Sequence, residues 1–378
     1  MVKRDLKMAI IVAIALIFII STQWIQNNIN KGPLIENIEL PENFKIGIFA
    51  SDLGKSLNLP GPNSGPRFME FHDDVLFVSL SSAGKVIALP DKDKDGKADE
   101  VIEVISGLNR PHGIAFYKDY MYIANEDSVI RVKLNDDFKA DIPDKEDFTD
   151  LPKGGHWTRT IRVKDGSLYI SIGSSCNVCI EKDERRASIL KCNLDFGRCN
   201  IYARGLRNAV GFAFHPETEE LYATENSRDL LGEDTPPDEI NIIESNKHYG
   251  WPFCYGKNVP DPEFGSGSCE HREQSFIDLQ AHSAPLGLAF NFGGNFPSEY
   301  KGKLFVAYHG SWNRKVPTGY KIVMIDTETK EVSDFATGWL TDKEKVLGRP
   351  VDIIFDKEGV MYVSDDNAGL IYRVSSKG

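Results

Sequence analysis

The stretch PRFMEFHDDVLFVSL, residues 66–80, decides the fold because its pattern returns five more times along the chain. It begins with proline and an alternating strand, passes through a short polar turn, and ends in a second apolar strand. The other copies are PHGIAFYKDYMYIAN from Pro111, HWTRTIRVKDGSLYISIG from His156, RNAVGFAFHPETEELYATEN from Arg207, PLGLAFNF with GKLFVAYHG from Pro285, and RPVDIIFDKEGVMYVSDD from Arg349. Alternation with a period of two, interrupted by turn pairs such as Asp165-Gly166, is typical of β-hairpins.

Most of these repeats occupy about 45–60 residues, which is the length of one four-stranded blade. Six repeats therefore predict an all-β fold, a six-bladed β-propeller whose blades pack around a central channel, over residues 33–378. The two longest repeats lie between Arg207 and Arg349 and carry insertions. We expect these insertions to lie on one face and to shape a site there.

The composition limits the class of protein. The chain has 378 residues, with 44 Lys and Arg against 56 Asp and Glu, which gives a net charge of −12. Its 41% hydrophobic and 26% charged residues are typical of a globular protein, and they exclude a disordered chain and a membrane protein with many spans. The acidic balance argues against nucleic acid as a partner, because such a partner requires clustered cations.

Residues 1–32 have the pattern of a membrane-targeting segment. Lys3, Arg4 and Lys7 precede the uncharged run MAIIVAIALIFII, residues 8–20. No small-residue cleavage site follows, so we expect an uncleaved signal-anchor helix, with a cleaved signal peptide or a buried soluble helix as alternatives. Basic residues stay on the cytoplasmic side, which predicts that the propeller is extracytoplasmic and is anchored to the cell membrane.

Six cysteines agree with export. They are Cys176, Cys179, Cys192, Cys199, Cys254 and Cys269. An even number in close sequence pairs predicts disulfides in an exported chain. A bridge from Cys192 to Cys199 would cross a hairpin, and one from Cys254 to Cys269 would close a loop, whereas the CNVC pair is less clear. The first four cysteines also fit a zinc cluster, which stays an alternative.

Polar residues recur at equivalent positions of the repeats, where the blades converge on the channel mouth. They are His112, His156, Arg207, Asn208, His309, Arg314 and Arg349. Several cations at one mouth would repel each other without an anion between them. This clustering predicts a ligand that carries carboxylates or phosphates.

A separate acidic loop, DKDKDGKADE, spans residues 91–100. Asp91, Asp93, Asp95 and Asp99 occupy positions 1, 3, 5 and 9 of a calcium loop, and Gly96 supplies the sharp turn. Ile102 stands at position 12, where an EF-hand has glutamate, so a true EF-hand is not expected. The loop predicts either a structural calcium site or a solvated acidic hairpin tip.

Four longer stretches resemble the soluble glucose/sorbosone dehydrogenases that depend on pyrroloquinoline quinone (PQQ). They are GGHWTRTI with LYISIGSS, GLRNAVGFAFHPETEELYATENSRDLLGEDTPPDEINIIESNKHYGWP, QAHSAPLGLAF and AYHGSWNRKVPTGYK. The resemblance runs from Leu40 to Val374 and is closest to the sorbosone and pyranose dehydrogenase branch. It implies a six-bladed propeller that holds PQQ and calcium at the channel mouth.

The resemblance also implies roles for individual residues. His156 matches the general base that takes a proton from the sugar while hydride passes to C5 of PQQ. Arg207 and Asn208 match the pair beside the reactive carbonyl, where positive charge stabilises a developing oxyanion. Further implied cofactor contacts are His309, Arg314 and Arg349. The implied catalytic calcium is held mainly by main-chain oxygens of Ser227 and Arg228, near the Asp229 carboxylate.

Three positions depart from the glucose dehydrogenase branch. The aspartate that orients the base is replaced by Ser174, so another group must orient His156 or the base is weaker. A second arginine is replaced by Val351. The Gly-Pro of the calcium turn is Ser227-Arg228.

Together these observations predict a PQQ- and calcium-dependent sugar dehydrogenase that oxidises an aldose or a related sugar aldehyde and passes electrons to an external acceptor. Two alternatives lack redox chemistry: a calcium-dependent lactonase, and a propeller that binds a glycan or a protein partner. The cationic residues at the channel mouth distinguish these hypotheses, because only the dehydrogenase requires all of them. His282 is expected to line the site.

Overall fold

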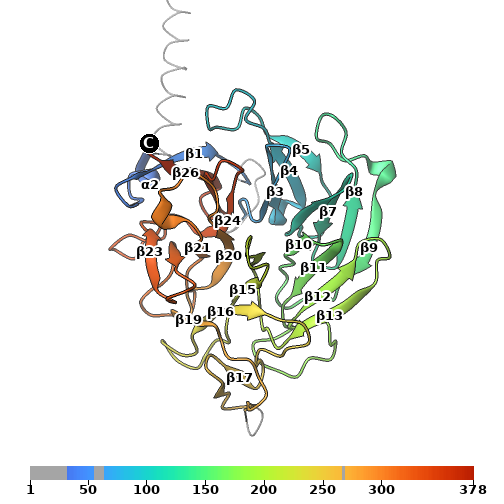
Figure 1. The fold of residues 1–378 in the computed structure, drawn as a ribbon, viewed down its shortest axis with the longest axis vertical. Helices are drawn as coiled ribbons and strands as arrows, with labels where there is room; N and C mark the ends of the chain where they lie inside the picture. Colours follow the sequence, from blue (N-terminus) through green and yellow to red (C-terminus); the bar gives the residue numbers. More distant parts are fainter. Residues whose placement is uncertain (1–31, 55–63, 266–268) are drawn as a thin grey trace, which may run out of the picture.

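The structure, a computed structural model, describes residues 32–54, 64–265 and 269–378. Within them the chain forms six antiparallel four-stranded sheets, arranged around a centre as the blades of a propeller (Figure 1). The predicted fold is therefore confirmed. The predicted signal-anchor lies outside the described residues apart from Gly32, and no helix among the described residues is long and apolar enough to span a membrane.

Each blade is named here by its order along the chain, and its strands are given from the channel outward. Blade 1 contains β2 (Met69–His72), β3 (Val75–Leu80), β4 (Lys85–Leu89) and β5 (Ile102–Ile105). Blade 2 contains β6 (Ile114–Tyr117), β7 (Tyr120–Ala124), β8 (Ser128–Val132) and β9 (Glu146–Asp150). Blade 3 contains β10 (Ile161–Lys164), β11 (Ser167–Ile172), β12 (Ser188–Asn193) and β13 (Cys199–Arg204).

The second half of the ring is built in the same way. Blade 4 contains β14 (Phe212–Phe214), β15 (Leu221–Glu225), β16 (Asp238–Ile243) and β19 (Ile277–Leu279), with the small hairpin β17 (Cys254–Tyr255) and β18 (Val259–Pro260) inserted before β19. Blade 5 contains β20 (Pro285–Phe290), β21 (Leu304–Tyr308), β22 (Lys321–Ile325) and β23 (Val332–Ala336). Blade 6 contains β24 (Pro350–Phe355), β25 (Met361–Asp365), β26 (Leu370–Ser376) and β1 (Phe44–Ala50).

Helical structure among the described residues is confined to short turns. These are α2 (Gly32–Ile35) and the 3-10 turns η2 (Ser81–Ala83), η3 (Ile142–Asp144) and η4 (Ser298–Tyr300).

The two ends of the propeller domain close the ring. Strand β1, blue in Figure 1, pairs antiparallel with β26, red, and Phe44 lies opposite Ser376. This pairing makes the first strand of the described residues the outer strand of the last blade. It satisfies the backbone groups along the edge of β26 and locks blade 6 to the start of the domain.

Apolar side chains fill the spaces between neighbouring sheets. One such cluster, between blades 5 and 6, includes Phe305, Trp339 and Tyr372, each fully buried. The inner strands approach closely, and glycine permits the approach. A Cβ on Gly113 would lie 2.6 Å from the main-chain nitrogen of Ile161 in the next blade, and one on Gly211 would lie 2.0 Å from the carbonyl oxygen of Leu286.

Candidate functional site at the channel mouth

One end of the channel collects the polar residues that the sequence singled out. In each blade the inner strand starts at the end where the second strand stops, because the two strands are antiparallel. Residues just before β10, β14 and β24 therefore share one face with residues just after β11, β15, β21 and β25. This face is the channel mouth.

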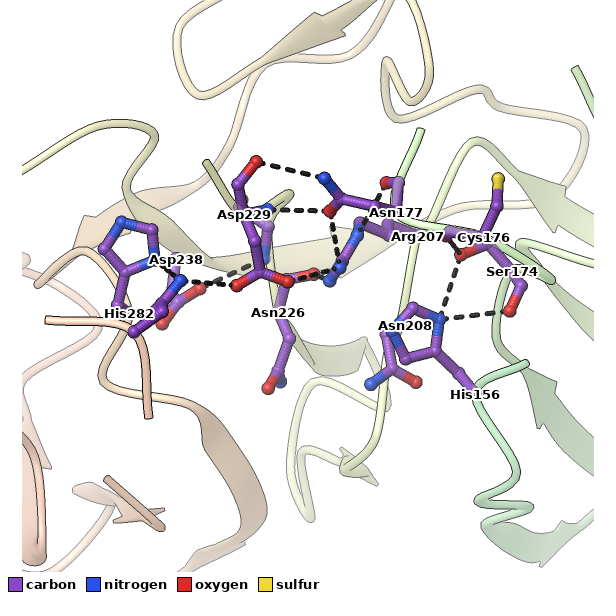
Figure 2. Close-up of polar contacts among 12 residues, drawn as sticks. His156, Ser174, Cys176, Asn177, Arg207, Asn208, Asn226, Asp229, Asp238 and His282 are labelled. Carbon is purple, nitrogen blue, oxygen red and sulfur yellow. Dashed lines mark hydrogen bonds and ion pairs between the residues drawn. The ribbon is translucent and has the colours of Figure 1, made fainter. Parts of the chain in front are cut away.

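His156 precedes β10 and is half-buried. Its Nδ1 lies 3.0 Å from the carbonyl oxygen of Ser174 and 3.0 Å from the Ser174 hydroxyl, as Figure 2 shows. Because that hydroxyl donates to the carbonyl of Cys176, the Ser174 carbonyl is the acceptor that requires a proton on Nδ1. The Nε2 of the neutral ring is then a proton acceptor. The main-chain carbonyl of Ser174 is thus the group that orients the His156 ring, which the sequence alone did not identify.

Burial is the main influence on the imidazole, followed by the charge of Arg207. Together they lower the pKa of His156 from 6.5 to about 4. The ring is therefore neutral at pH 7, as a general base must be. The backbone of His156 itself is held by Arg159, whose guanidinium donates to the His156 carbonyl at 2.7 Å.

Arg207 lies between β13 and β14 and is 4% exposed. It donates from Nε to the carbonyl of Asn177 at 2.9 Å and from Nη2 to the side-chain oxygen of Asn177 at 2.9 Å. It also forms an ion pair with Asp229 at 2.9 Å and donates from Nη1 to the carbonyl of Asn226 at 3.0 Å. Figure 2 shows these residues converging from three loops.

Asn208 follows Arg207 and lies beside His156 in Figure 2. None of the described residues bonds to its side-chain amide, whereas its main-chain N–H donates to Glu225. Burial raises the pKa of Glu225 well above its usual range. The amide of Asn208 is therefore available to a ligand next to the His156 ring.

The residues expected to hold calcium follow β15. Ser227 donates its N–H to Asp238, and the side chain of Arg228 forms a buried ion pair with Asp261 at 2.7 Å. Within the described residues, no donor reaches the main-chain oxygens of Ser227 and Arg228. Main-chain oxygens are among the hard ligands that calcium prefers, so these two fit the predicted ion. The Asp229 carboxylate is already bonded, through Oδ2 to Arg207 and through Oδ1 to Asn313 at 2.7 Å.

Three blades meet through a second buried group at the mouth. His309, after β21, lies 2.9 Å from Asp366, after β25, and Asp366 forms an ion pair with Arg67, which precedes β2. Burial alone raises the pKa of Asp366, but attraction from His309 and Arg67 outweighs it and lowers the pKa to about 2. Asp366 and Arg67 were not predicted from the sequence.

The remaining predicted cofactor contacts are also held by the protein. Arg314 forms an ion pair with Asp234 at 3.0 Å and donates to the carbonyl of Glu233. Arg349 donates from Nη2 to the hydroxyl of Tyr320 at 3.1 Å. Arg314 therefore connects the loop after β21 to the loop after β15, whereas Arg349 packs against blade 5.

These contacts correct one argument from the sequence. Several cations at the mouth do not require an external anion, because Asp229, Asp234 and Asp366 neutralise Arg207, Arg314 and Arg67. Burial lowers the pKa of His309, so its ring adds no cation at neutral pH. Two half-buried arginines at this face, Arg186 and Arg349, are not neutralised in this way. Arg186 donates to main-chain carbonyls, Arg349 donates to carbonyls and a phenol, and neither forms an ion pair with a described carboxylate. These two guanidinium groups fit the carboxylates of PQQ.

Three other residues that the sequence singled out are buried in the protein. His112 is fully buried against Phe68, with ring centroids 4.2 Å apart. His282 is 7% exposed, and its Nε2 donates to the carbonyl of Gly232 at 2.8 Å, so it braces a loop at the mouth. Val351, which replaces a family arginine, packs with three apolar residues of other blades below the mouth, Phe68, Val210 and Leu286. The channel is apolar there.

The described cysteines form three disulfides, Cys176–Cys179, Cys192–Cys199 and Cys254–Cys269. The disulfide prediction is confirmed, and it excludes the zinc alternative because bonded sulfurs are not thiolate ligands. In the acidic loop, carboxylate oxygens of Asp91, Asp93 and Asp99 lie within 4.8 Å of one another, and Asp95 is not in this group. Calcium at that loop stays a prediction.

The fold and the mouth define a six-bladed propeller with a polar site at one end of its channel. Residues 63–262 and 257–377 match the model of the family described as TrAA12-like, and the chain belongs to this family. This confirms the family resemblance seen in the sequence.

Three proteins illustrate the similarity. An uncharacterized protein of Borreliella burgdorferi is 34% identical over 362 residues, which is 90% of this chain and 91% of that protein. A PQQ-dependent pyranose dehydrogenase of Coprinopsis cinerea is 24% identical over 294 residues, and the match covers 58% of this chain and 39% of that protein. A calcium structure of Carbohydrate-Active Enzymes Family AA12 from Trichoderma reesei has a TM-score of 0.76 at 20% identity, covering 90% of this chain and 97% of that one. The structural likeness shows the fold.

Proposed function

We propose that this protein is a PQQ- and calcium-dependent dehydrogenase that oxidises an aldose or a related sugar aldehyde, with His156 as the general base. The observation that carries the proposal is the orientation of His156. Its Nδ1 faces the Ser174 carbonyl, so its Nε2 is a neutral proton acceptor, beside the free amide of Asn208 at the channel mouth. The family and the name of the Coprinopsis relative support the same chemistry.

Oxidation of a sugar at its reducing carbon removes one hydride and one proton. PQQ supplies the hydride acceptor when it is bound, and calcium polarises its carbonyl. In this proposal Nε2 of His156 takes the hydroxyl proton, and the imidazole later releases it to water. Arg207, whose charge lies close to the ring, favours return of the imidazolium to the neutral form.

The other mouth residues bind and orient. Arg349 and Arg186 would present cations to the carboxylates of PQQ, and Asn208 would present an amide. The main-chain oxygens of Ser227 and Arg228 would hold the metal, next to Asp229 in the chain. The apolar layer below the mouth, which includes Val351, excludes water from the deeper channel. We further propose that the propeller works outside the cytoplasm, held to the membrane by residues 1–32, and that it passes electrons to an external acceptor.

One observation favours a second candidate, a propeller without redox chemistry that acts as a lactonase or binds a glycan or a protein partner. Arg207, Arg314 and Arg67 already have carboxylate partners, so these cations are stable without PQQ. Such a protein would use the same mouth and calcium without an electron acceptor.

A dye-linked assay separates the two functions. The purified protein is incubated with PQQ and calcium, and dye reduction is followed with a panel of aldoses. Sugar-dependent reduction that requires PQQ and disappears with EDTA is the expected result. If the protein does not bind PQQ, the redox proposal fails, and lactone hydrolysis and glycan binding become the activities to measure.

A further inference from the structure

The loop between β11 and β12 contains a contact centre that the proposed chemistry does not use directly. Asn177 lies between Cys176 and Cys179, which close a four-residue loop by a disulfide. Its main-chain oxygen accepts hydrogen bonds from Nε of Arg207 at 2.9 Å and from the indole of Trp251 at 3.2 Å. Its side chain contacts Arg207 and Asp229 at the same time (Figure 2).

The side-chain contacts use both ends of the amide. The oxygen accepts from Nη2 of Arg207 at 2.9 Å and from the main-chain N–H of Asp229 at 2.8 Å. The nitrogen donates to the carbonyl of Asp229 at 3.1 Å. Asparagine offers an acceptor and a donor on one short side chain without charge. The neutral side chain of Asn177 therefore holds Arg207 and Asp229 in place without changing the net charge of their ion pair.

These bonds determine which edge of Arg207 a ligand can reach. Nε and Nη2 are occupied by Asn177 and Asp229, and Nη1 donates one of its two N–H groups to Asn226. Among the described residues, none accepts the second N–H of Nη1. Asn177 thus leaves Nη1 as the edge of the guanidinium that can face a bound anion.

Asn177 also selects the oxygens that remain for a metal. The carbonyl of Asp229 is bonded to Asn177, whereas those of Ser227 and Arg228 accept no hydrogen bond from the described residues. The same loop reaches the base, because the Cys176 carbonyl accepts from the hydroxyl of Ser174 at 2.6 Å. One short loop therefore connects the base, the buried cation and the metal turn.

We propose that Asn177 is a positioning residue of the mouth: it holds Arg207 and Asp229 in register, so that Nη1 of Arg207 faces the cofactor and the carbonyls before Asp229 face the metal. This inference rests on the proposed function for the identity of the cofactor. The placement of Arg207 relative to Asp229 does not depend on the cofactor, so the two claims can be tested separately.

The test compares three variants of the full chain. Asn177→Ala removes the side-chain hydrogen bonds to Arg207 and Asp229. Asn177→Asp keeps the shape of the side chain but replaces its donor with a negative charge beside Arg207. Asn291→Ala is the matched control, because buried Asn291 donates to the carbonyl of Tyr300 at 3.0 Å within blade 5 and away from the mouth. The measurements are the Kd for PQQ in calcium, the thermal midpoint, and crystal structures of the proteins without PQQ.

We expect Asn177→Ala to raise the Kd for PQQ about tenfold and Asn177→Asp to raise it further, because the added charge repels the cofactor carboxylates. Asn291→Ala should lower the thermal midpoint and leave the Kd unchanged. A Kd within about twofold of the original in Asn177→Ala would overturn the inference. If Asn177→Ala does not fold, the isosteric Asn177→Asp decides by the same criterion.

If the unaltered protein does not bind PQQ, the proposed function fails and the crystal structures decide the inference alone. Displacement of the Arg207 guanidinium from Asp229 in Asn177→Ala supports the positioning role. An unchanged Arg207–Asp229 pair in that variant contradicts it.

Discussion

The carbonyl of Ser174 contacts His156 twice. The main-chain N–H of His156 donates to the Ser174 carbonyl at 2.9 Å, and Nδ1 of the ring lies 3.0 Å from the same oxygen. The backbone and the tautomer of the imidazole are thus fixed by one carbonyl. In this role a main-chain oxygen stands where the resemblance to the glucose dehydrogenase branch implies an aspartate, and it adds no negative charge next to the ring.

Removal of the imidazole should abolish turnover. We expect His156→Ala to lower kcat by about 10²–10⁴-fold, which is the usual contribution of a general base, while the Kd for PQQ changes little. Dye-linked rates and a PQQ titration measure the two quantities. His271→Ala, at an exposed position, is the control. Turnover in the His156 variant equal to that of the original protein rejects the assignment of the base.

Removal of the Ser174 hydroxyl should have a smaller effect. In Ser174→Ala the carbonyl that holds Nδ1 remains, so we expect kcat to fall by less than about tenfold. Comparison of kcat for this variant with that of His156→Ala checks the claim. A loss in Ser174→Ala as large as that in His156→Ala would show that the hydroxyl, and not the carbonyl, orients the ring.

The acid limit of activity should lie well below the usual titration of histidine. Burial, followed by the charge of Arg207, lowers the pKa of His156 to about 4, so kcat/KM should stay high through pH 6 and fall only towards pH 4. The unfolded chain protonates near 6.5, so this group makes folding less favourable as the pH falls from 6.5 to about 4. A pH profile of kcat/KM with an acid limb near 6.5 would contradict this prediction.

The buried Asp366 should contribute to stability through Arg67 and His309. Asp366→Asn removes the anion between them, and we expect a loss of about 3–5 kcal/mol in the free energy of unfolding, measured with urea. Asp334→Asn, which breaks a more exposed pair with Lys321, is the control and should have little effect. Because the pKa of Asp366 is lowered from 3.8 to about 2, its contribution is present above pH 3.8 and is lost as the pH falls to 2.

The disulfide beside Asn177 should matter for the cofactor more than for the fold. We expect the double variant Cys176→Ser and Cys179→Ser to raise the Kd for PQQ about tenfold. The pair Cys192→Ser and Cys199→Ser, in the outer hairpin of blade 3, should instead lower stability by about 2 kcal/mol and leave the Kd unchanged. Equal Kd values for the two double variants would contradict a specific role for the inner disulfide.

Much of the fold could be predicted because each blade begins with a local pattern. A hairpin such as residues 66–80 shows its alternation and turn within fifteen residues, so six copies predict six blades. The pairs Cys192–Cys199 and Cys254–Cys269 were predictable for the same reason, since both bridges are short in sequence. Closure of the ring by β1 was not predicted, because its partner strand lies at the other end of the chain.

The site was predictable only in part. Resemblance to the family pointed to His156, Arg207 and Asn208, which do lie together at the mouth. The buried group around His309 joins distant repeats, and no local pattern marks its other members: Arg67 and Asp366 are 299 positions apart. The sequence did contain one indication of Asn177. It lies between two cysteines only three positions apart, and a disulfide between them restricts the position of its backbone.

The most direct test of the proposed function is a single-turnover experiment. The protein is loaded with PQQ and calcium, freed of oxygen and other acceptors, and mixed with an aldose while the absorbance of the cofactor is recorded. The account predicts reduction of one bound PQQ per chain, complete with the original protein and strongly slowed in His156→Ala. Bound PQQ that stays oxidised with every sugar tested would contradict the proposed dehydrogenase.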